Sequence, residues 1–218
     1  MATKNILSVS ARKGNNCGIV GEVTKVEDGK FTVKYLGKDD KEFSKSFNLK
    51  DGIKAPKEGQ TVLVKYTYKD KVNTAIFIAD TKRFVGRIEF AGLGDKAEKE
   101  SNKLGINWFV GTVDGVYPAE DGEKGNISLY MGKDDPKQSI GVWGTDKVEA
   151  AEAVKPVRED DGTTFTRVLV VTGEGRKNAK DGKEYVNYSA FDIIPISTYK
   201  VEKKADAVEE EATMPWDI

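Results

Sequence analysis

The stretch QSIGVWGTDKVEAAEAVKPV, residues 138–157, places a helix directly after a strand in a chain otherwise rich in strand patterns. Its first part, SIGVW, alternates apolar and small residues, which predicts a strand with one buried face. Thr145 then caps a helix that contains Glu149 and several alanines and ends before Pro156. This is the one convincing helix that the pattern predicts.

The segments around this helix supply the other strands of one fold. NWFVGTVDGVYPAEDG (107–122) and NISLYMGK (126–133) precede it, and FTRVLVVTGEG (165–175) and KEYVNYSAFDIIPI (183–196) follow. Three strands, a helix and two strands is the order of an OB-fold, a five-stranded Greek-key barrel that binds oligonucleotides and oligosaccharides. We therefore expect an OB-fold domain in residues 107–200.

The first half of the chain predicts a second small barrel in residues 1–80, with OB-like topology as one option. FTVKYL (31–36), EFSKSFNL (42–49) and TVLVKYTY (61–68) alternate, with IVGEVTKV before them and TAIFIAD after, separated by turn residues. The pattern puts Lys45 on one face with Phe43 and Phe47, and it favours core positions for Tyr66 and Tyr68. Five short strands without a helix favour a closed barrel, because closure removes exposed strand edges.

Residues 81–106 read as the connection between the two barrels. RFVGRIEFAG (83–92) predicts an extra strand, and GDKAEKESNKLG (94–105) is polar enough for a short exposed helix or a linker. The overall expectation is a mainly β chain of two barrels, followed by a disordered acidic tail at 201–218.

Composition excludes several classes of function. The 218 residues include no histidine and one cysteine, Cys17, so soft metal sites and His-dependent nucleophilic catalysis are excluded and no cofactor is expected. We expect a protein that is not an enzyme. No run of about 18 apolar residues predicts a membrane span. The absence of a signal peptide and of an internal disulfide favours the bacterial or infected-host cytoplasm.

The charge is unevenly distributed. Residues 205–218 carry five of the 36 acidic residues and no lysine or arginine, which leaves 31 acidic against 35 basic residues, about +4, in the rest of the chain. A slightly basic body with a separate acidic tail is informative about partners, although the protein is not strongly basic.

The sequence from SIGVWG to NYSAFDI resembles the second half of bacterial-type single-stranded DNA-binding proteins (SSBs). The resemblance lies in Trp143 at a strand end, Ala150–Val154 in the helix, Gly173, the basic loop Arg176–Lys183 and the strand Tyr185–Ile194. It covers roughly Asn107–Ile196 and the tail. Because the short bacterial family has one barrel, the whole chain looks more like a divergent, viral (phage) version with two.

Two aromatic residues are the first candidates for nucleic-acid binding. In NISLYM, Ile127, Leu129 and Met131 share the apolar face, so Tyr130 points outward. In SIGVW, Ile140 and Val142 face the core, so Trp143 points outward. Single strands are bound by stacking bases on aromatic rings beside a cationic groove. The alternative is that both rings cover a barrel mouth or pack against the other barrel.

Further candidates lie around this pair. Tyr117, expected in a loop after the first strand, can reach the groove, and Trp108 is a candidate although core is favoured for it and for Phe109, one of which should face inward and the other outward. The loop residues Arg176, Lys177, Lys180 and Lys183 are candidates for holding phosphates, or simply form a solvated hairpin loop. Arg12 and Lys13 belong to a polar arm that can lie along a nucleic acid.

The tail carries the candidate contacts with other proteins. In the SSB family an acidic tail ends in a Pro-aromatic tip that docks into partner pockets, which implies a partner-binding role here for the charges and the apolar anchor of the tip: Glu209, Glu210, Glu211, Met214, Pro215, Trp216, Asp217 and Ile218. In the family the aromatic residue is terminal, whereas two residues follow Trp216, so Ile218 is an alternative anchor. The tail folding back on its own barrel is the other interpretation.

The sequence thus predicts a sequence-tolerant single-stranded DNA-binding protein of DNA replication, recombination or repair, whose tail recruits replication or repair proteins. An RNA-binding barrel protein and a structural or virion protein are the alternatives. The sequence leaves homo-oligomerisation open.

Overall fold

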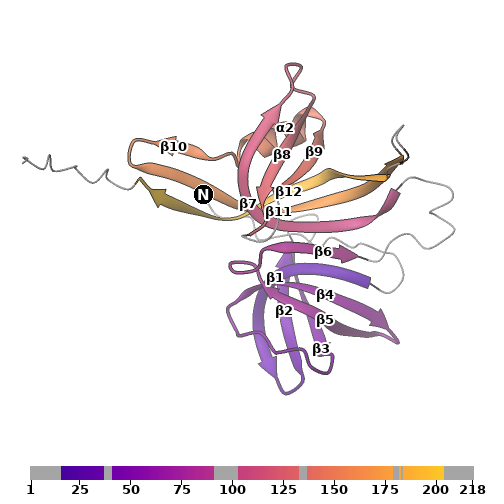
Figure 1. Ribbon diagram of the computed structural model, residues 1–218. Helices are drawn as coiled ribbons and strands as arrows, with labels where there is room; N and C mark the ends of the chain where they lie inside the picture. The colour runs from indigo at the N-terminus through magenta and orange to yellow at the C-terminus, as the bar shows by residue number, and fades with distance from the viewer. Residues whose placement is uncertain are drawn as a thin grey trace, which may run out of the picture.

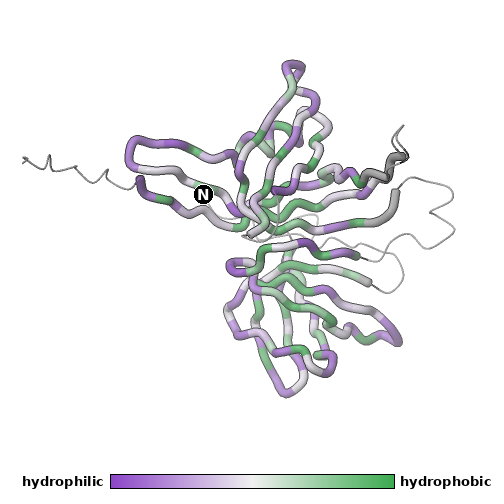
Figure 2. Tube along the Cα trace, in the orientation of Figure 1, coloured by the Kyte–Doolittle hydropathy of each residue, from purple (hydrophilic) through white to green (hydrophobic). Residues whose placement is uncertain are grey.

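Two β-barrels account for most of the protein in a computed structural model, which describes residues 16–36, 41–90, 103–132, 137–178, 182 and 184–203. The first barrel and the larger second sheet lie against each other (Figure 1). Apolar residues concentrate along the strands near the middle of the molecule, and hydrophilic residues gather at the hairpin turns (Figure 2). The expectation of a mainly β chain is confirmed.

The first barrel consists of β1 (Asn16–Glu27), β2 (Lys30–Leu36), β3 (Glu42–Leu49), β4 (Thr61–Lys69) and β5 (Val72–Asp80). It closes in the order β1-β2-β3-β5-β4, with β3 and β5 parallel. Its core contains Phe31, Val33, Phe47, Val62 and Val64, as the alternation predicts. Tyr66 is buried as expected, but the core position for Tyr68 is wrong: its side chain is exposed near the end of β4.

The second sheet contains seven strands: β6 (Gly86–Phe90), β7 (Lys103–Pro118), β8 (Lys124–Tyr130), β9 (Gln138–Trp143), β10 (Val157–Glu159), β11 (Gly162–Asn178) and β12 (Glu184–Glu202). Five of them close in the order β7-β8-β9-β12-β11, because β11 also pairs with β7. β9 and β12 are parallel. Both barrels therefore have the strand order of an OB-fold, and the OB-fold prediction is confirmed.

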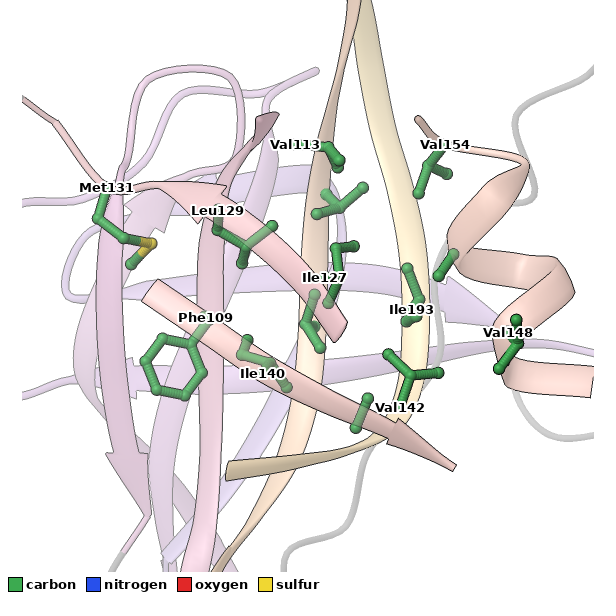
Figure 3. Packing of buried hydrophobic residues seen from close by; sticks show 14 residues of the cluster. Phe109, Val113, Ile127, Leu129, Met131, Ile140, Val142, Val148, Val154 and Ile193 are labelled. Carbon is green, nitrogen blue, oxygen red and sulfur yellow. The ribbon is translucent and has the colours of Figure 1, made fainter. Parts of the chain in front are cut away.

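The one helix of the described residues, α2 (Thr145–Glu152), lies between the third and fourth strands of the second barrel. Val148 and Ala151 bring its buried side into the barrel core, and the turn after it adds Val154 (Figure 3). The prediction that Thr145 caps the helix is wrong. Gly144 occupies the cap position with a φ of 97°, a left-handed conformation that glycine adopts readily, and no side chain caps the helix.

The extra strand predicted before the second barrel is present as β6, which pairs with β7. The polar segment that follows it lies outside the described residues except for the first residues of β7. The length of β11 and β12 was not anticipated. With β10 they form an arm that projects beyond the barrel, at the left of Figure 1.

The two barrels pack back to back through equivalent strands. Val20 on β1 and Leu63 on β4 enter one apolar cluster with Trp108 on β7 and Leu169 on β11. These strands are the first and fourth of each barrel. Gly18 permits this approach, because a Cβ there would lie 2.5 Å from Cη2 of Trp108 and 2.6 Å from Cζ of Phe90. The second and third strands of each barrel lie away from this contact.

Polar contacts also hold the connection between the barrels. Arg167 on β11 is buried and donates from Nε to the carbonyl of Thr81 at 2.9 Å and from its guanidinium to the carbonyl of Phe84. Lys65 on β4 donates to the carbonyl of Glu89 on β6 at 2.5 Å. Burial lowers the pKa of Arg167. Backbone carbonyls therefore accept hydrogen bonds from the Arg167 guanidinium. Without them, burying this charged group among apolar side chains would be costly.

Candidate nucleic-acid interface

The outer face of β7, β8 and β9 carries the exposed aromatic rings. Ile127 and Leu129 are fully buried and Tyr130 is 43% exposed, which confirms the predicted alternation of β8. On β9, Ile140 and Val142 are buried and Trp143 is 60% exposed, as predicted. Figure 3 shows the inward side chains of both strands meeting in the core. The period-two pattern therefore places both rings on the outside of the barrel.

The two predicted rings are on adjacent strands but not side by side. Trp143 is opposite Lys124 at the start of β8, whereas Tyr130, at the end of β8, is opposite Thr112 on β7. Six residues of strand separate the two rows, or about 20 Å. A single nucleotide cannot contact both rings, so they mark two ends of a face.

Tyr117 lies between these ends. The expectation of a loop position is wrong, because β7 continues to Pro118 and Tyr117 pairs with Asn126, which in turn pairs with Gly141. Its side chain is 60% exposed. From strand spacing and rise, the Cα atoms of Tyr117 and Trp143 are about 12 Å apart. These two residues form the closest aromatic neighbours on this face.

Glycines beneath both rings let them fold back over the sheet. A Cβ on Gly141 would lie 3.2 Å from Nε1 of Trp143, and one on Gly115 would lie 2.6 Å from the hydroxyl of Tyr117. Ser128 and Ser139 face each other in the same sheet. The surface under and between the rings is therefore low and polar, and the upper faces of the rings stay open to solvent.

Exposed lysines flank the aromatic face, each paired with a carboxylate. Lys137 donates to Asp114 at 2.7 Å, a hydrogen bond that raises the pKa of Lys137. Lys124 lies 3.5 Å from Asp121, with both side chains about half exposed. Such exposed pairs are weak and screened by salt, so a phosphate can replace the carboxylate. Sequence reasoning missed these lysines, although Lys124 shares the outward parity of Tyr130.

Trp108 does not belong to this face. The candidate is wrong as a stacking residue in this structure, because its side chain is fully buried between the barrels. The expectation that one of Trp108 and Phe109 faces inward and the other outward, with core favoured for each, is confirmed: Phe109 lies in the core of the second barrel, and Trp108 lies on the opposite face of β7, where the first barrel buries it. Both faces of β7 are covered here. The apolar run WFV, residues 108–110, was the available signal, because strands buried on both faces lack alternation.

The basic loop is shorter than expected. Arg176 and Lys177 belong to the last three residues of β11, where their backbones pair with Val186 and Tyr185. Lys180 and Lys183 lie outside the described residues, as do Arg12, Lys13 and the tail from residue 204 on. The structure therefore does not place these candidates relative to the aromatic face.

A buried polar network lies where β11 and β12 approach the loop that joins them. Arg87 donates from Nε to Asn107 at 2.8 Å, and Asn107 donates to Glu174 at 3.0 Å. The Arg87 guanidinium also lies over the ring of Tyr188, 5.1 Å from its centroid. These contacts link β6, β7, β11 and β12 next to the loop between β11 and β12.

Within the described ranges, no group of three or more Cys, Asp or Glu side chains is arranged to hold a metal ion. In the same part of the chain, no helix is long and apolar enough to cross a membrane. The chemistry that the described surface offers is stacking, hydrogen bonding and charge.

No protein-family model and no curated protein matches the chain. Among solved structures, the chain is similar to a deletion mutant of the single-stranded DNA-binding protein from Thermus aquaticus, at 12% sequence identity and a TM-score of 0.30. The similarity covers 85% of this chain and 96% of that one. A likeness at this level carries no weight for function, which is derived below from the side chains.

Proposed function

We propose that this protein binds single-stranded DNA without strong sequence preference, on the outer face of β7, β8 and β9. The observation that carries the proposal is the pair Tyr117 and Trp143, two aromatic rings that are 60% exposed and folded over glycines on β7 and β9, the strands on either side of β8. Exposing two large rings to water is unfavourable unless a partner covers them. Every base offers a π-face to such rings, so stacking tolerates sequence.

The geometry favours separate bases on separate rings. Tyr117 and Trp143 hold bases near one end of the face, and Tyr130 holds another base near the opposite end. Each stacked base contributes about 1–3 kcal/mol. Between the rings lie the hydroxyls of Ser128 and Ser139 and one amide, that of Asn126, so this surface offers a single side chain able to make the bidentate contact that reads a base.

Phosphates are held by lysines at the rim. Lys124 and Lys137 exchange their carboxylate partners for phosphate oxygens, and the basic residues of the β11–β12 loop (Arg176, Lys177, Lys180 and Lys183) and of the arm (Arg12 and Lys13) add to them. Release of counterions then makes affinity fall as salt rises.

The first barrel supports this assignment by contrast. The outward residues of its second and third strands are hydrophilic: Thr32 hydrogen-bonds to Ser46 at 2.9 Å, and Lys34 pairs with Glu42 at 3.2 Å. Described aromatic rings are absent from this outer face, which otherwise has the same strand order. Of the two equivalent outer faces, it is therefore that of the second barrel which offers stacking.

The wider role follows from binding single strands. We assign the protein to DNA replication, recombination or repair in the cytoplasm, in a viral (phage) version of the SSB type, and the tail to recruiting other proteins through Met214, Pro215 and Trp216. Deleting residues 213–218 should abolish recruitment while leaving DNA affinity equal or higher. A body destabilised by that deletion would contradict a purely recruiting tail.

A fluorescence titration with oligonucleotides at several salt concentrations tests the proposal. Trp108 is buried, so in a Trp216→Phe background the quenching on binding should come from Trp143. Trp143→Phe should lose the quenching but keep most of the affinity, whereas Trp143→Ala should lose both. Matched RNA strands separate the DNA and RNA alternatives. An ordered assembly with no binding to either strand at low salt would favour the structural alternative.

A further inference from the structure

One end of the first barrel gathers six side chains on the inward face of its strands: Cys17, Tyr35, Phe43, Lys45, Tyr66 and Tyr68. Cys17 pairs with Tyr66 and Tyr35 pairs with Phe43, and the Lys45 ammonium lies near the rings of both Tyr35 and Tyr66, which brings the two pairs together. We call this group the aromatic end. Phe43 and Tyr68 are each 48% exposed, so this end meets solvent.

Lys45 is the unusual member of the aromatic end. It alternates with Phe43 and Phe47 on the inward face of β3, where the core side of a barrel normally carries apolar residues. Its Nζ donates to the hydroxyl of Tyr66 at 2.8 Å and lies 5.0 Å and 5.7 Å from the ring centroids of Tyr66 and Tyr35. Within the described residues, no carboxylate lies within ion-pair distance of it. A half-buried ammonium is therefore held by rings and one hydroxyl.

Among the described side chains, this arrangement leaves the Lys45 ammonium without a carboxylate partner. Burial lowers the pKa of Lys45, which shows that desolvation disfavours its charged form. A bound anion would offset that cost, because an opposite charge within a few ångströms favours the ammonium. Exposed lysines such as Lys34, which already pairs with Glu42, have no comparable need.

A stacking surface lies next to this charge. The rings of Tyr35 and Phe43 are stacked with centroids 5.9 Å apart and planes 28° from parallel. One face of Phe43 is covered by Tyr35, and the ring is about half exposed, so its other face is available to a flat ligand. An ammonium beside an open ring matches a ligand with a phosphate attached close to a heterocyclic base.

We propose that the aromatic end of the first barrel binds one nucleotide unit, with its phosphate on Lys45 and its base on Phe43. This proposal deepens the proposed function, on which it rests, because it makes the first barrel a second contact for the single strand. The outer face of β7–β9 and the aromatic end are then separate sites on barrels that pack back to back.

The test uses the full-length protein and mononucleotide probes observed by NMR. Addition of dTMP should shift the Lys45 side-chain and Phe43 ring signals and raise the pKa of Lys45. Thymidine and inorganic phosphate at equal concentration should each give a smaller shift, since each supplies only half of the ligand. Lys45→Met should reduce dTMP affinity at least tenfold, whereas Lys34→Met, which removes a charge from the outside of the same barrel, should leave it unchanged.

Two outcomes would overturn this proposal. The first is unchanged Lys45 and Phe43 signals up to about 10 mM dTMP, a limit that excludes even weak binding. The second is equal affinity of Lys45→Met and Lys34→Met for dTMP. This result would mean that Lys45 only fills space at the end of the barrel. If Lys45→Met unfolds, Phe43→Leu tests the same site, because it removes the ring on which the base of dTMP is proposed to stack. These outcomes differ from a failure of the proposed function. That failure would appear as unchanged oligonucleotide binding by Trp143→Ala.

If dTMP binds, the source of the natural ligand is decided by competition. A nucleotide unit of a strand predicts that oligonucleotides shift the same Lys45 signal at concentrations far below those of dTMP, and that Lys45→Met weakens binding of long strands. Shifts by dTMP that no oligonucleotide reproduces would contradict the strand contact and indicate a site for free nucleotides.

Discussion

The indole of Trp143 folds back over Gly141, with Nε1 3.2 Å from the position that a Cβ on this glycine would occupy. The same relationship holds between Tyr117 and Gly115. A ring that covers a glycine protects the strand backbone and at the same time presents its other face outward. The candidate interface is therefore made by glycine and aromatic residues two positions apart on the same strand.

Removing the ring of Trp143 should weaken binding of single strands by about 1–3 kcal/mol, or roughly 5- to 150-fold, because one stacked base is lost. Titrating a fluorescently labelled oligothymidine with Trp143→Ala and with the wild type measures this loss of affinity. Val201→Ala, which shortens an exposed apolar side chain near the far end of β12, is the control and should bind normally. Equal affinities of the two variants would remove Trp143 from the interface.

Moving a ring without deleting it should also weaken binding. Gly115→Ala places a methyl group where the Tyr117 hydroxyl now lies, and the flexible end of the tyrosine must shift. We expect a smaller loss of affinity than for Tyr117→Ala and an unchanged thermal midpoint. Ser128→Ala, on the same face, should change neither, and an unaltered affinity of Gly115→Ala would show that the ring position is unimportant.

The rim lysines should determine part of the salt dependence. Lys124→Gln and Lys137→Gln should each reduce the slope of log K against log salt concentration by about 0.7, the value for one phosphate contact in a single strand. Lys54→Gln, on the first barrel, should leave the slope unchanged. The slope is measured from titrations between low and moderate salt, and an identical slope in all three variants would contradict the rim contacts.

Packing between the barrels should be sensitive to a single methyl group. Gly18→Ala drives a Cβ into the rings of Trp108 and Phe90, which are both buried, so neither ring can move freely. Overpacking of this kind costs about 1–3 kcal/mol of unfolding free energy. Denaturant unfolding measures it, with Thr24→Ala on the exposed side of β1 as the control. Full stability of Gly18→Ala would argue against the back-to-back contact.

Stability should fall in alkaline solution through Tyr66. Burial raises the pKa of Tyr66 above its ordinary value of 10.0, so above about pH 10 the unfolded chain releases this proton while the folded chain keeps it. The folded state then binds more protons than the unfolded state, and unfolding free energy decreases as pH rises. Tyr66→Phe should flatten this decrease between about pH 10 and 12 in chemical unfolding. A slope equal to that of the wild type would contradict it.

Local pattern was sufficient for much of the second barrel. The alternation in NISLYM and SIGVW placed Ile127 and Ile140 inside and Tyr130 and Trp143 outside, because strand side chains alternate between two faces. The order of three strands, helix and two strands was sufficient for the OB-fold. Turn residues and one helix in a chain of short strands leave few other ways to bury these apolar faces.

What the sequence determined by itself is thus the inward and outward faces of strands with one covered side, and the order of elements along the chain. The tertiary structure alone decided which outward faces meet a partner within the molecule. Trp108 is buried because β1 and β4 of a distant segment cover the back of β7, and Tyr117 joins the interface because β7 bends along β8. Register across strands also decided that Tyr130 and Trp143 mark opposite ends of one face. Alternation reports only burial within a strand, whereas pairing and packing depend on contacts between residues far apart in the chain.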